Sequence, residues 1–166
     1  DLPFLSVQLA SYCRPNAAPG DKTCWAILRE SQHLAVEKTP YCALVTALDI
    51  GEANNIHPVN KKEVGRRLAL VAIEAAKSGR WQTLNPSYLS HEIRGGEATI
   101  KFANVRGNLI AKTLPLPWFE IAGDDRKFVP AEARISGREV IVSSPAAPHP
   151  VAVRYAWTDN PERLGL

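Results

Sequence analysis

The pattern of apolar and polar positions in residues 1–80 predicts two units of a strand followed by a helix. Residues 2–12 and 43–48 are apolar runs of strand length, which are typical of strands buried on both faces of a parallel sheet. Residues 25–36 and 61–78 follow them with helical spacing. Alternating strands and helices predict parallel strands joined by right-handed crossovers. Two strands are too few for a stable, doubly covered sheet, so we expect further chain to complete it.

The second helix has predicted signals at both ends. Asn60 is placed to accept a hydrogen bond from the first-turn amides, and Glu63 follows three residues later, as in a capping box. Ser78 and Gly79 end the helix. Its neighbouring cations Arg66 and Arg67 are most simply a solvated face.

From residue 95 onward, short runs with strand character are separated by turn residues. These runs cover residues 98–102, 118–121, 133–135, 140–142 and 151–157. Ser136 and Gly137 are a hairpin signal between two runs, whereas residues 81–90 are predicted to be irregular. We therefore expect an α/β domain with a partial parallel sheet over residues 1–80. A mainly antiparallel, β-sandwich-like domain should follow over residues 81–166.

The end of the second predicted strand carries the most distinctive polar residues. Asp49 closes the apolar run, Gly51 permits a turn, and His57 stands before Pro58, whose ring disfavours a helical backbone at the histidine. Open α/β sheets place ligands and catalytic groups on loops at the carboxyl ends of parallel strands. We therefore expect the carboxylate and the imidazole to face one crevice.

Composition narrows the function classes without choosing one. The chain has 166 residues, a formal net charge of +3 and 45% hydrophobic residues, with both charge signs interspersed. Such a small net charge, with no cluster of one sign, does not predict binding to nucleic acid or to a membrane. The chain has an odd number of cysteines, so they cannot all pair with one another. One disulfide could join Cys13 to Cys24, but we favour three free thiols. No His, Cys and carboxylate cluster suggests a metal, and we expect no cofactor.

The sequence DIGEANNIHPVNKKEVGRRLA, from Asp49 to Ala69, resembles the histidine block of the sialate O-acetylesterase family of SGNH-type serine esterases. Residues 2–9, 25–32 and 153–157 carry supporting matches. The resemblance implies a partial SGNH-hydrolase-like sheet and a secreted or periplasmic enzyme. The implied reaction removes O-acetyl groups from sialic acid or from an acetylated polysaccharide such as xylan.

The resemblance also implies roles for individual residues. His57 is our choice for the base that takes the proton of a serine hydroxyl, since that hydroxyl is too weakly acidic to attack alone. Asp49 is favoured as its acid partner, with Glu52 or a backbone carbonyl as alternatives. Asn54 and Asn55 occupy positions where related enzymes often carry aspartate.

Two further residues match the family within predicted secondary structure. Arg29 lies on the first predicted helix and Gln8 in the first predicted strand, and both are candidates for substrate binding. For Arg29 a structural contact is the simpler interpretation, and for Gln8 the alternative is a bond to neighbouring backbone.

The family's nucleophile motif, of the Gly-Gln-Ser-Asn type, does not occur in this sequence. No Gly-x-Ser-x-Gly elbow occurs either. The chain starts at Asp1 and has no methionine, so we expect a processed piece, an expression fragment or one part of a larger polypeptide. It resembles the carboxyl-terminal half of the enzyme, which would need the remainder, or a second chain with the serine, for activity. The alternatives are a non-catalytic carbohydrate-binding or interaction module and a degenerate hydrolase.

Overall fold

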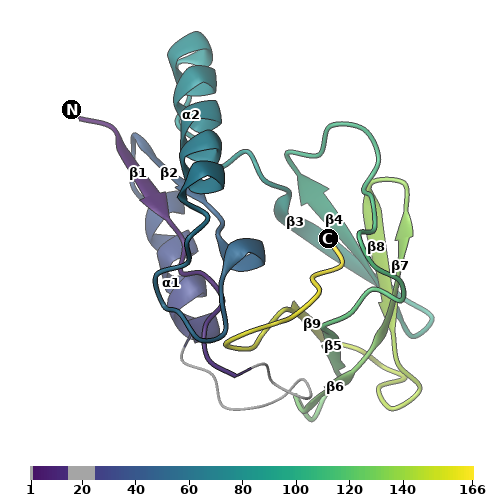
Figure 1. The fold of residues 1–166 in the computed structure, drawn as a ribbon. Helices are drawn as coiled ribbons and strands as arrows, with labels where there is room; N and C mark the ends of the chain where they lie inside the picture. The colour runs from purple at the N-terminus through teal and green to yellow at the C-terminus, as the bar shows by residue number, and fades with distance from the viewer. Residues whose placement is uncertain (1, 15–24) are drawn as a thin grey trace.

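The computed structural model describes residues 2–14 and 25–166 and shows a half with helices and parallel strands beside a half with antiparallel strands (Figure 1). The first half contains β1 (Phe4–Val7), α1 (Trp25–Glu37), β2 (Cys42–Val45), the 3-10 helix η1 (Leu48–Ile50) and α2 (Lys61–Ser78). The second contains β3 (Ser87–Arg94), β4 (Glu97–Ala103), β5 (Phe119–Ala122), β6 (Phe128–Pro130), β7 (Glu132–Ser136), β8 (Glu139–Ser143) and β9 (Ala152–Tyr155). No helix among the described residues is long and apolar enough to cross a membrane.

The parallel sheet of the first half is confirmed, in part. Strands β1 and β2 run parallel, with Phe4 opposite Cys42 and Val7 opposite Val45. The sheet has two strands within the described residues, so the expected SGNH-like sheet is only partly present. Both helices contact β2.

The expectation that both strands are buried is correct for β2 and wrong for β1. Ala43, Leu44 and Val45 in β2 are buried, whereas Phe4 in β1 is 64% exposed. Strand β1 also covers only part of the apolar run that predicted it. The reason is that α1 and α2 both pack on β2 rather than on β1, so the described chain covers β2 and leaves β1 largely uncovered.

Helix α2 begins and ends as the sequence predicts. The Asn60 side chain accepts a hydrogen bond from the Glu63 amide at 3.2 Å. Gly79 ends the helix with a φ of +71°, and its amide donates to the Ala75 carbonyl. Val71 packs with the buried residues of β2, so the helix covers one side of that strand.

The second half consists of two antiparallel sheets, with strand orders β3-β4-β8-β7 and β6-β5-β9. This confirms the antiparallel expectation, and residues 136–139 form the predicted hairpin between β7 and β8. A single core lies between the sheets; its buried members are Ala98, Ile100, Leu116, Phe119, Ile121, Val140, Val142 and Ala147.

The prediction of an irregular segment over residues 81–90 is wrong at its end, because β3 begins at Ser87. The strand lacks a regular alternation of apolar and polar residues, and its register with β4 shifts between Tyr88 and Ser90. Its formation depends on pairing with β4 rather than on its own pattern.

A buried ion pair crosses the smaller sheet. Glu120 on β5 is 1% exposed, and its two carboxylate oxygens accept from Arg154 on β9 at 2.7 and 2.9 Å. The Arg154 guanidinium also lies over the Phe128 ring, 4.1 Å from its centroid. The charge on each partner is therefore compensated inside the sheet.

Removing one partner of this pair should destabilise the fold strongly. Glu120→Ala leaves the Arg154 guanidinium without its counter-charge, which should lower the free energy of unfolding by about 3 kcal/mol. The control is Arg134→Ala, which removes an exposed pair with Glu97 and should cost less than about 1 kcal/mol. Urea denaturation measures both, and equal losses would contradict the importance of the buried pair.

Candidate functional site

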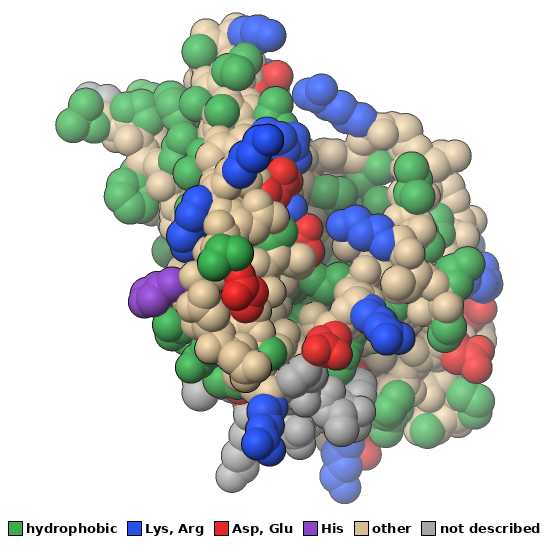
Figure 2. Space-filling model, in the orientation of Figure 1, with side chains coloured by type: hydrophobic (Ala, Val, Ile, Leu, Met, Phe, Trp, Pro, Cys, Tyr) green, Lys and Arg blue, Asp and Glu red, His purple; other side chains and the backbone are tan. Residues whose placement is uncertain are grey.

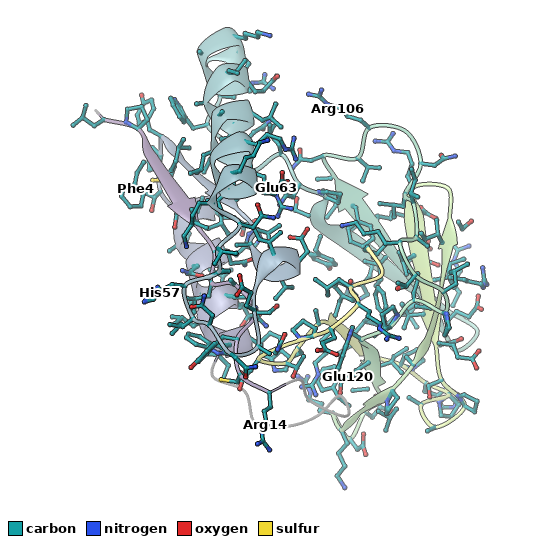
Figure 3. The ribbon with its side chains drawn as sticks, viewed as in Figure 1. Phe4, Arg14, His57, Glu63, Arg106 and Glu120 are labelled. Carbon is teal, nitrogen blue, oxygen red and sulfur yellow. The ribbon has the colours of Figure 1, made fainter. Side chains whose placement is uncertain are left out.

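The candidate site is built on the loop that connects β2 to α2. Its central residue, His57, is exposed, and its side chain points away from the β-rich half (Figure 3). The imidazole has no hydrogen-bond partner within the described part of the chain. The ring is thus accessible to groups that approach from outside this chain.

Hydrogen bonds inside the loop fix the backbone around His57. The Asn55 side-chain oxygen accepts from the His57 amide at 2.9 Å. Glu52 Oε1 accepts from the Val59 amide at 2.7 Å, which closes the loop from its other end. Because both contacts hold main-chain groups, they orient the backbone of His57 and leave its ring free.

Asp49 is held by an arginine rather than by the histidine. Its two oxygens accept from Arg67 Nη1 at 2.6 Å and Nη2 at 2.8 Å. These hydrogen bonds are the main cause that lowers the pKa of Asp49 below its ordinary value. The second cation beside it is Lys112, 3.8 Å away. Asp49, the acid partner that the sequence favours, is therefore paired with Arg67 and not with His57.

Arg67 connects three segments and is not part of a solvated helix face, so that interpretation of the sequence is wrong. Besides Asp49, its guanidinium donates to the Thr46 carbonyl and to Glu63 Oε1, each at 2.8 Å. The side chain is only 15% exposed. One residue thereby links the end of β2, η1 and the first turns of α2. The Glu63 to Arg67 spacing of four residues was the available signal in the sequence.

Glu52, the alternative acid, lies within the histidine loop itself. Besides the Val59 contact, its Oε2 accepts from the Asn55 side-chain amide at 3.5 Å. It has no arginine or lysine partner among the described residues. Its negative charge is thus not neutralised in the way that Arg67 neutralises Asp49.

Arg29 is buried between α1 and the end of the chain. It is 5% exposed, and its guanidinium donates to the backbone carbonyls of Ala156, Thr158 and Asp159. Burial lowers its pKa to about 10, so it remains charged at neutral pH. In this position Arg29 joins the two halves of the chain, as the structural interpretation of the sequence expects.

Gln8 also makes contacts between segments. Its side-chain nitrogen donates to the Arg29 carbonyl at 3.2 Å, and its oxygen accepts from the Thr46 hydroxyl at 3.0 Å. The four residues singled out by the sequence therefore do not converge. Gln8 and Asp49 line a groove between the two halves, whereas His57 and Arg29 lie outside it.

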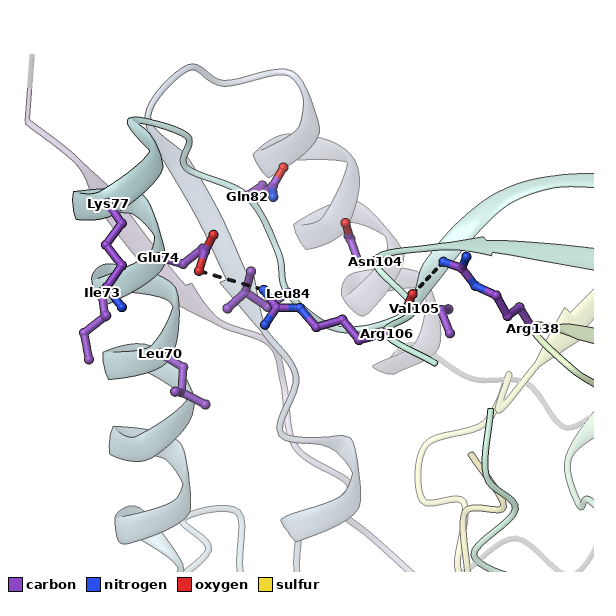
Figure 4. A pocket seen from close by; sticks show the side chains of 10 residues that line it. All are labelled: Leu70, Ile73, Glu74, Lys77, Gln82, Leu84, Asn104, Val105, Arg106 and Arg138. Atoms are coloured by element: carbon purple, nitrogen blue, oxygen red, sulfur yellow. Dashed lines mark hydrogen bonds and ion pairs between the residues drawn. The ribbon is translucent and has the colours of Figure 1, made fainter. Parts of the chain in front are cut away.

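Two open cavities lie between α2 and the β-rich half. The larger, of about 750 Å³, is lined by both halves and includes Gln8, Asp49 and Tyr155. The smaller, of about 560 Å³, lies beside the last turns of α2 (Figure 4). In it, Arg106 approaches Glu74 at 3.8 Å and Arg138 donates to the Val105 carbonyl.

The described residues show neither a metal site nor a disulfide. These residues contain no group of three His, Cys, Asp or Glu side chains placed to hold a metal ion. Cys13 and Cys42 are free thiols. Cys24, the other member of the considered disulfide, lies outside the described residues.

Comparison with known proteins relates the chain to an esterase. No family model and no curated protein matches it. The crystal structure of a carbohydrate acetylesterase from Xanthomonas citri superposes with a TM-score of 0.82 at 38% sequence identity. The alignment covers 99% of this chain and 38% of the length of that enzyme. The chain is therefore related to a carbohydrate esterase, of which it spans well under half.

The histidine loop should be sensitive to added bulk at Gly51. A Cβ atom there would clash with the backbone of Ser11, which crosses directly over the loop. Gly51→Ala should therefore lower the free energy of unfolding by about 1–3 kcal/mol. Gly65→Ala is the matched control, because an added Cβ there meets no atom within 4 Å beyond the neighbouring backbone of its own helix.

In the middle of α2, that control substitution should stabilise the chain by about 0.5–1 kcal/mol. Denaturant unfolding of the two variants measures the difference. A neutral Gly51→Ala would show that the segment around Ser11 does not pack against the loop as described.

Proposed function

We propose that this chain is the histidine-bearing part of a carbohydrate O-acetylesterase that uses a serine nucleophile located outside these 166 residues. The observation that carries the proposal is the 38% identity, over nearly the whole chain, to a carbohydrate acetylesterase. The exposed imidazole of His57, on a loop that follows a parallel strand, supports it.

In the proposed reaction, His57 takes the proton of the serine hydroxyl as the oxygen attacks the acetyl carbonyl. It then returns that proton to the sugar oxygen, which leaves as the acetyl group stays on the serine. The same imidazole then deprotonates a water that attacks the acetyl carbonyl, and acetate is released as the imidazolium returns the proton to the serine oxygen. The loop contacts of Glu52 and Asn55 support this role because they hold the His57 backbone without occupying the ring.

The contacts favour Glu52 over Asp49 as the carboxylate that stabilises the imidazolium. Asp49 is paired with Arg67 through both oxygens, so its charge is largely compensated before any imidazolium forms. Glu52 belongs to the histidine loop and keeps its charge uncompensated by a cation. We therefore assign Asp49 to anchoring the loop, through Arg67, on α2.

The serine-bearing polypeptide is proposed to dock along β1. Leu2 is 93% exposed and Phe4 64% exposed, an unusual state for large apolar residues at a parallel strand. Hydrophobic side chains gather there on the surface (Figure 2). Phe4 and His57 lie on the same side of the molecule, away from the β-rich half (Figure 3). A polypeptide that extends the sheet beside β1 would therefore also approach the imidazole.

Acetylated sugars are the proposed substrates, and the placement of Arg29 favours neutral ones such as acetylated xylan over sialic acid. A sialate-specific site requires a positioned cation for the sugar carboxylate. Arg29 was the candidate in this chain, and three backbone carbonyls already use its guanidinium.

A non-catalytic sugar-binding module is the less supported alternative. Its aromatic candidates include Phe119 and Tyr155, whose rings pack against each other at 4.6 Å. Phe119 is 3% exposed. The Phe119 ring therefore belongs to the core and offers no stacking face to a pyranose ring, whereas Tyr155 is partly buried against that core.

Substitution of His57 tests the proposed base. In the complete enzyme, His57→Ala should lower the turnover of an aryl acetate by at least about a thousandfold, because only binding and oxyanion stabilisation remain. His149→Ala is the control, because His149 is exposed, lies in the β-rich half and lines neither cavity, so turnover should stay within about twofold. Turnover of His57→Ala within tenfold of the parent would contradict the assignment.

The two carboxylates can be separated by activity and stability together. Glu52→Gln should lower kcat more than Asp49→Asn does, because it removes the charge that stabilises the imidazolium. Asp49→Asn should instead lower the free energy of unfolding by about 1–3 kcal/mol, since a charged hydrogen-bond pair with Arg67 is lost. A larger kcat loss in Asp49→Asn, with unchanged stability, would restore Asp49 as the acid partner.

A further inference from the structure

The face of β3 that should join the core of the β-rich half is uncovered. In the register of β3 with β4, Tyr88 lies opposite Phe102 and Ile93 lies opposite Ala98. Residues paired directly across two strands share one face of the sheet. Ala98 is completely buried in the core, yet Ile93 beside it is 38% exposed and Tyr88 is 60% exposed.

The exposure follows from a mismatch between the two sheets. One has four strands and the other has three, and the core cluster draws on β4, β7 and β8 but contains no described residue of β3. The smaller sheet therefore covers three strands of the larger one. Strand β3 extends beyond the cover, with seven of its eight residues exposed.

The outer edge of β3 is also free. The strand lies at the end of the sheet order, and β4 is its only partner in the described sheet. The edge is eight residues long and contains no proline, and its charged residues Glu92 and Arg94 are paired with each other. Its unpaired amides and carbonyls are suited to an extended backbone rather than to a small molecule.

This edge opens into the larger groove between the halves. Ser87, Tyr88 and Phe102 contribute to the lining of that groove, opposite Leu70 and Val71 of α2. The groove thus joins the uncovered face of β3 to a wall of the α/β half that carries both apolar side chains and the Asp49–Arg67 ion pair. An occupant would be enclosed by both halves at once.

We propose that a β-strand of the serine-bearing polypeptide pairs with the free edge of β3 and lays apolar side chains over its uncovered face. This inference rests on the proposed function and adds a second docking surface, separate from that at β1. Two observations support this choice of occupant. The unpaired strand edge requires extended backbone, and the related esterase has more than half of its length without a counterpart in this chain.

Hydrogen–deuterium exchange of the complete enzyme, compared with the 166-residue chain alone, tests this pairing. The amides of residues 87–94 that point away from β4 should exchange about tenfold more slowly, or slower still, in the complete enzyme. Unchanged exchange in β3, while residues 4–7 of β1 become protected, would overturn the β3 inference and leave the proposed function intact. Protection of β3 in an enzyme without esterase activity would support the pairing and contradict the function.

Substitutions at two neighbouring residues of β3 test which face of the strand the partner contacts. Ile93→Gln removes an apolar side chain from the uncovered face and should cancel most of the added protection. Glu92→Gln is the control, because Glu92 lies opposite Thr99 on the other face and forms only an exposed pair with Arg94. Equal effects of the two variants would contradict a strand laid over the uncovered face.

A second copy of this chain is the competing occupant. It would protect β3 in the isolated chain, in proportion to chain concentration, and sedimentation would show a dimer. That result would overturn the assignment of the edge to the serine-bearing polypeptide. Fast exchange of the β3 amides in the isolated chain, at every chain concentration, would support that assignment.

Discussion

The position of the histidine loop depends on the guanidinium of Arg67. It connects the Thr46 carbonyl at the end of β2, the Asp49 carboxylate on η1 and Glu63 in the first turn of α2. Because Arg67 lowers the pKa of Asp49, the link contributes stability above about pH 4, the ordinary range of this carboxyl group, and loses it as the pH falls through the lower pKa of the folded state. The segment that carries His57 is thereby held by charge at one end and by the Asn60 cap of α2 at the other.

The apolar surfaces of the chain lead to one account of its assembly. Strand β1 exposes Phe4 at an unpaired edge of a parallel sheet, and β3 exposes Tyr88 on a face that should be core. Burying apolar surface is the main favourable term in folding and association, and we propose on this basis that both regions contact further polypeptide. Between them, Arg29 holds the two halves of the chain together through backbone carbonyls.

The sequence predicts the local structure well where a residue's own chemistry decides it. The Asn60 cap, the Gly79 helix end and the hairpin at Ser136 all depend on residues a few positions apart. It fails where distant segments decide the outcome. Strand β3 forms because β4 pairs with it, and β1 is exposed because both helices pack on β2.

In the candidate site, too, the sequence predicts what nearby residues decide and misses what distant segments decide. His57 on a loop after a parallel strand follows from the pattern of residues 43–58. The partner of Asp49 does not, because Arg67 lies 18 residues away and reaches it only when α2 packs beside η1. Arg29 matched an enzyme family by sequence, yet only the fold shows that its charge is directed at carbonyls of residues 156–159.

His57 is proposed to activate a serine located outside this chain. Treatment of the complete enzyme with a serine-directed organophosphate, followed by peptide mass spectrometry, tests it most directly. The account predicts a phosphorylated serine in polypeptide other than these 166 residues, no labelling of the isolated chain, and loss of labelling in His57→Ala. Labelling of a serine within this chain, or labelling of His57→Ala at the rate of the parent, would contradict the account.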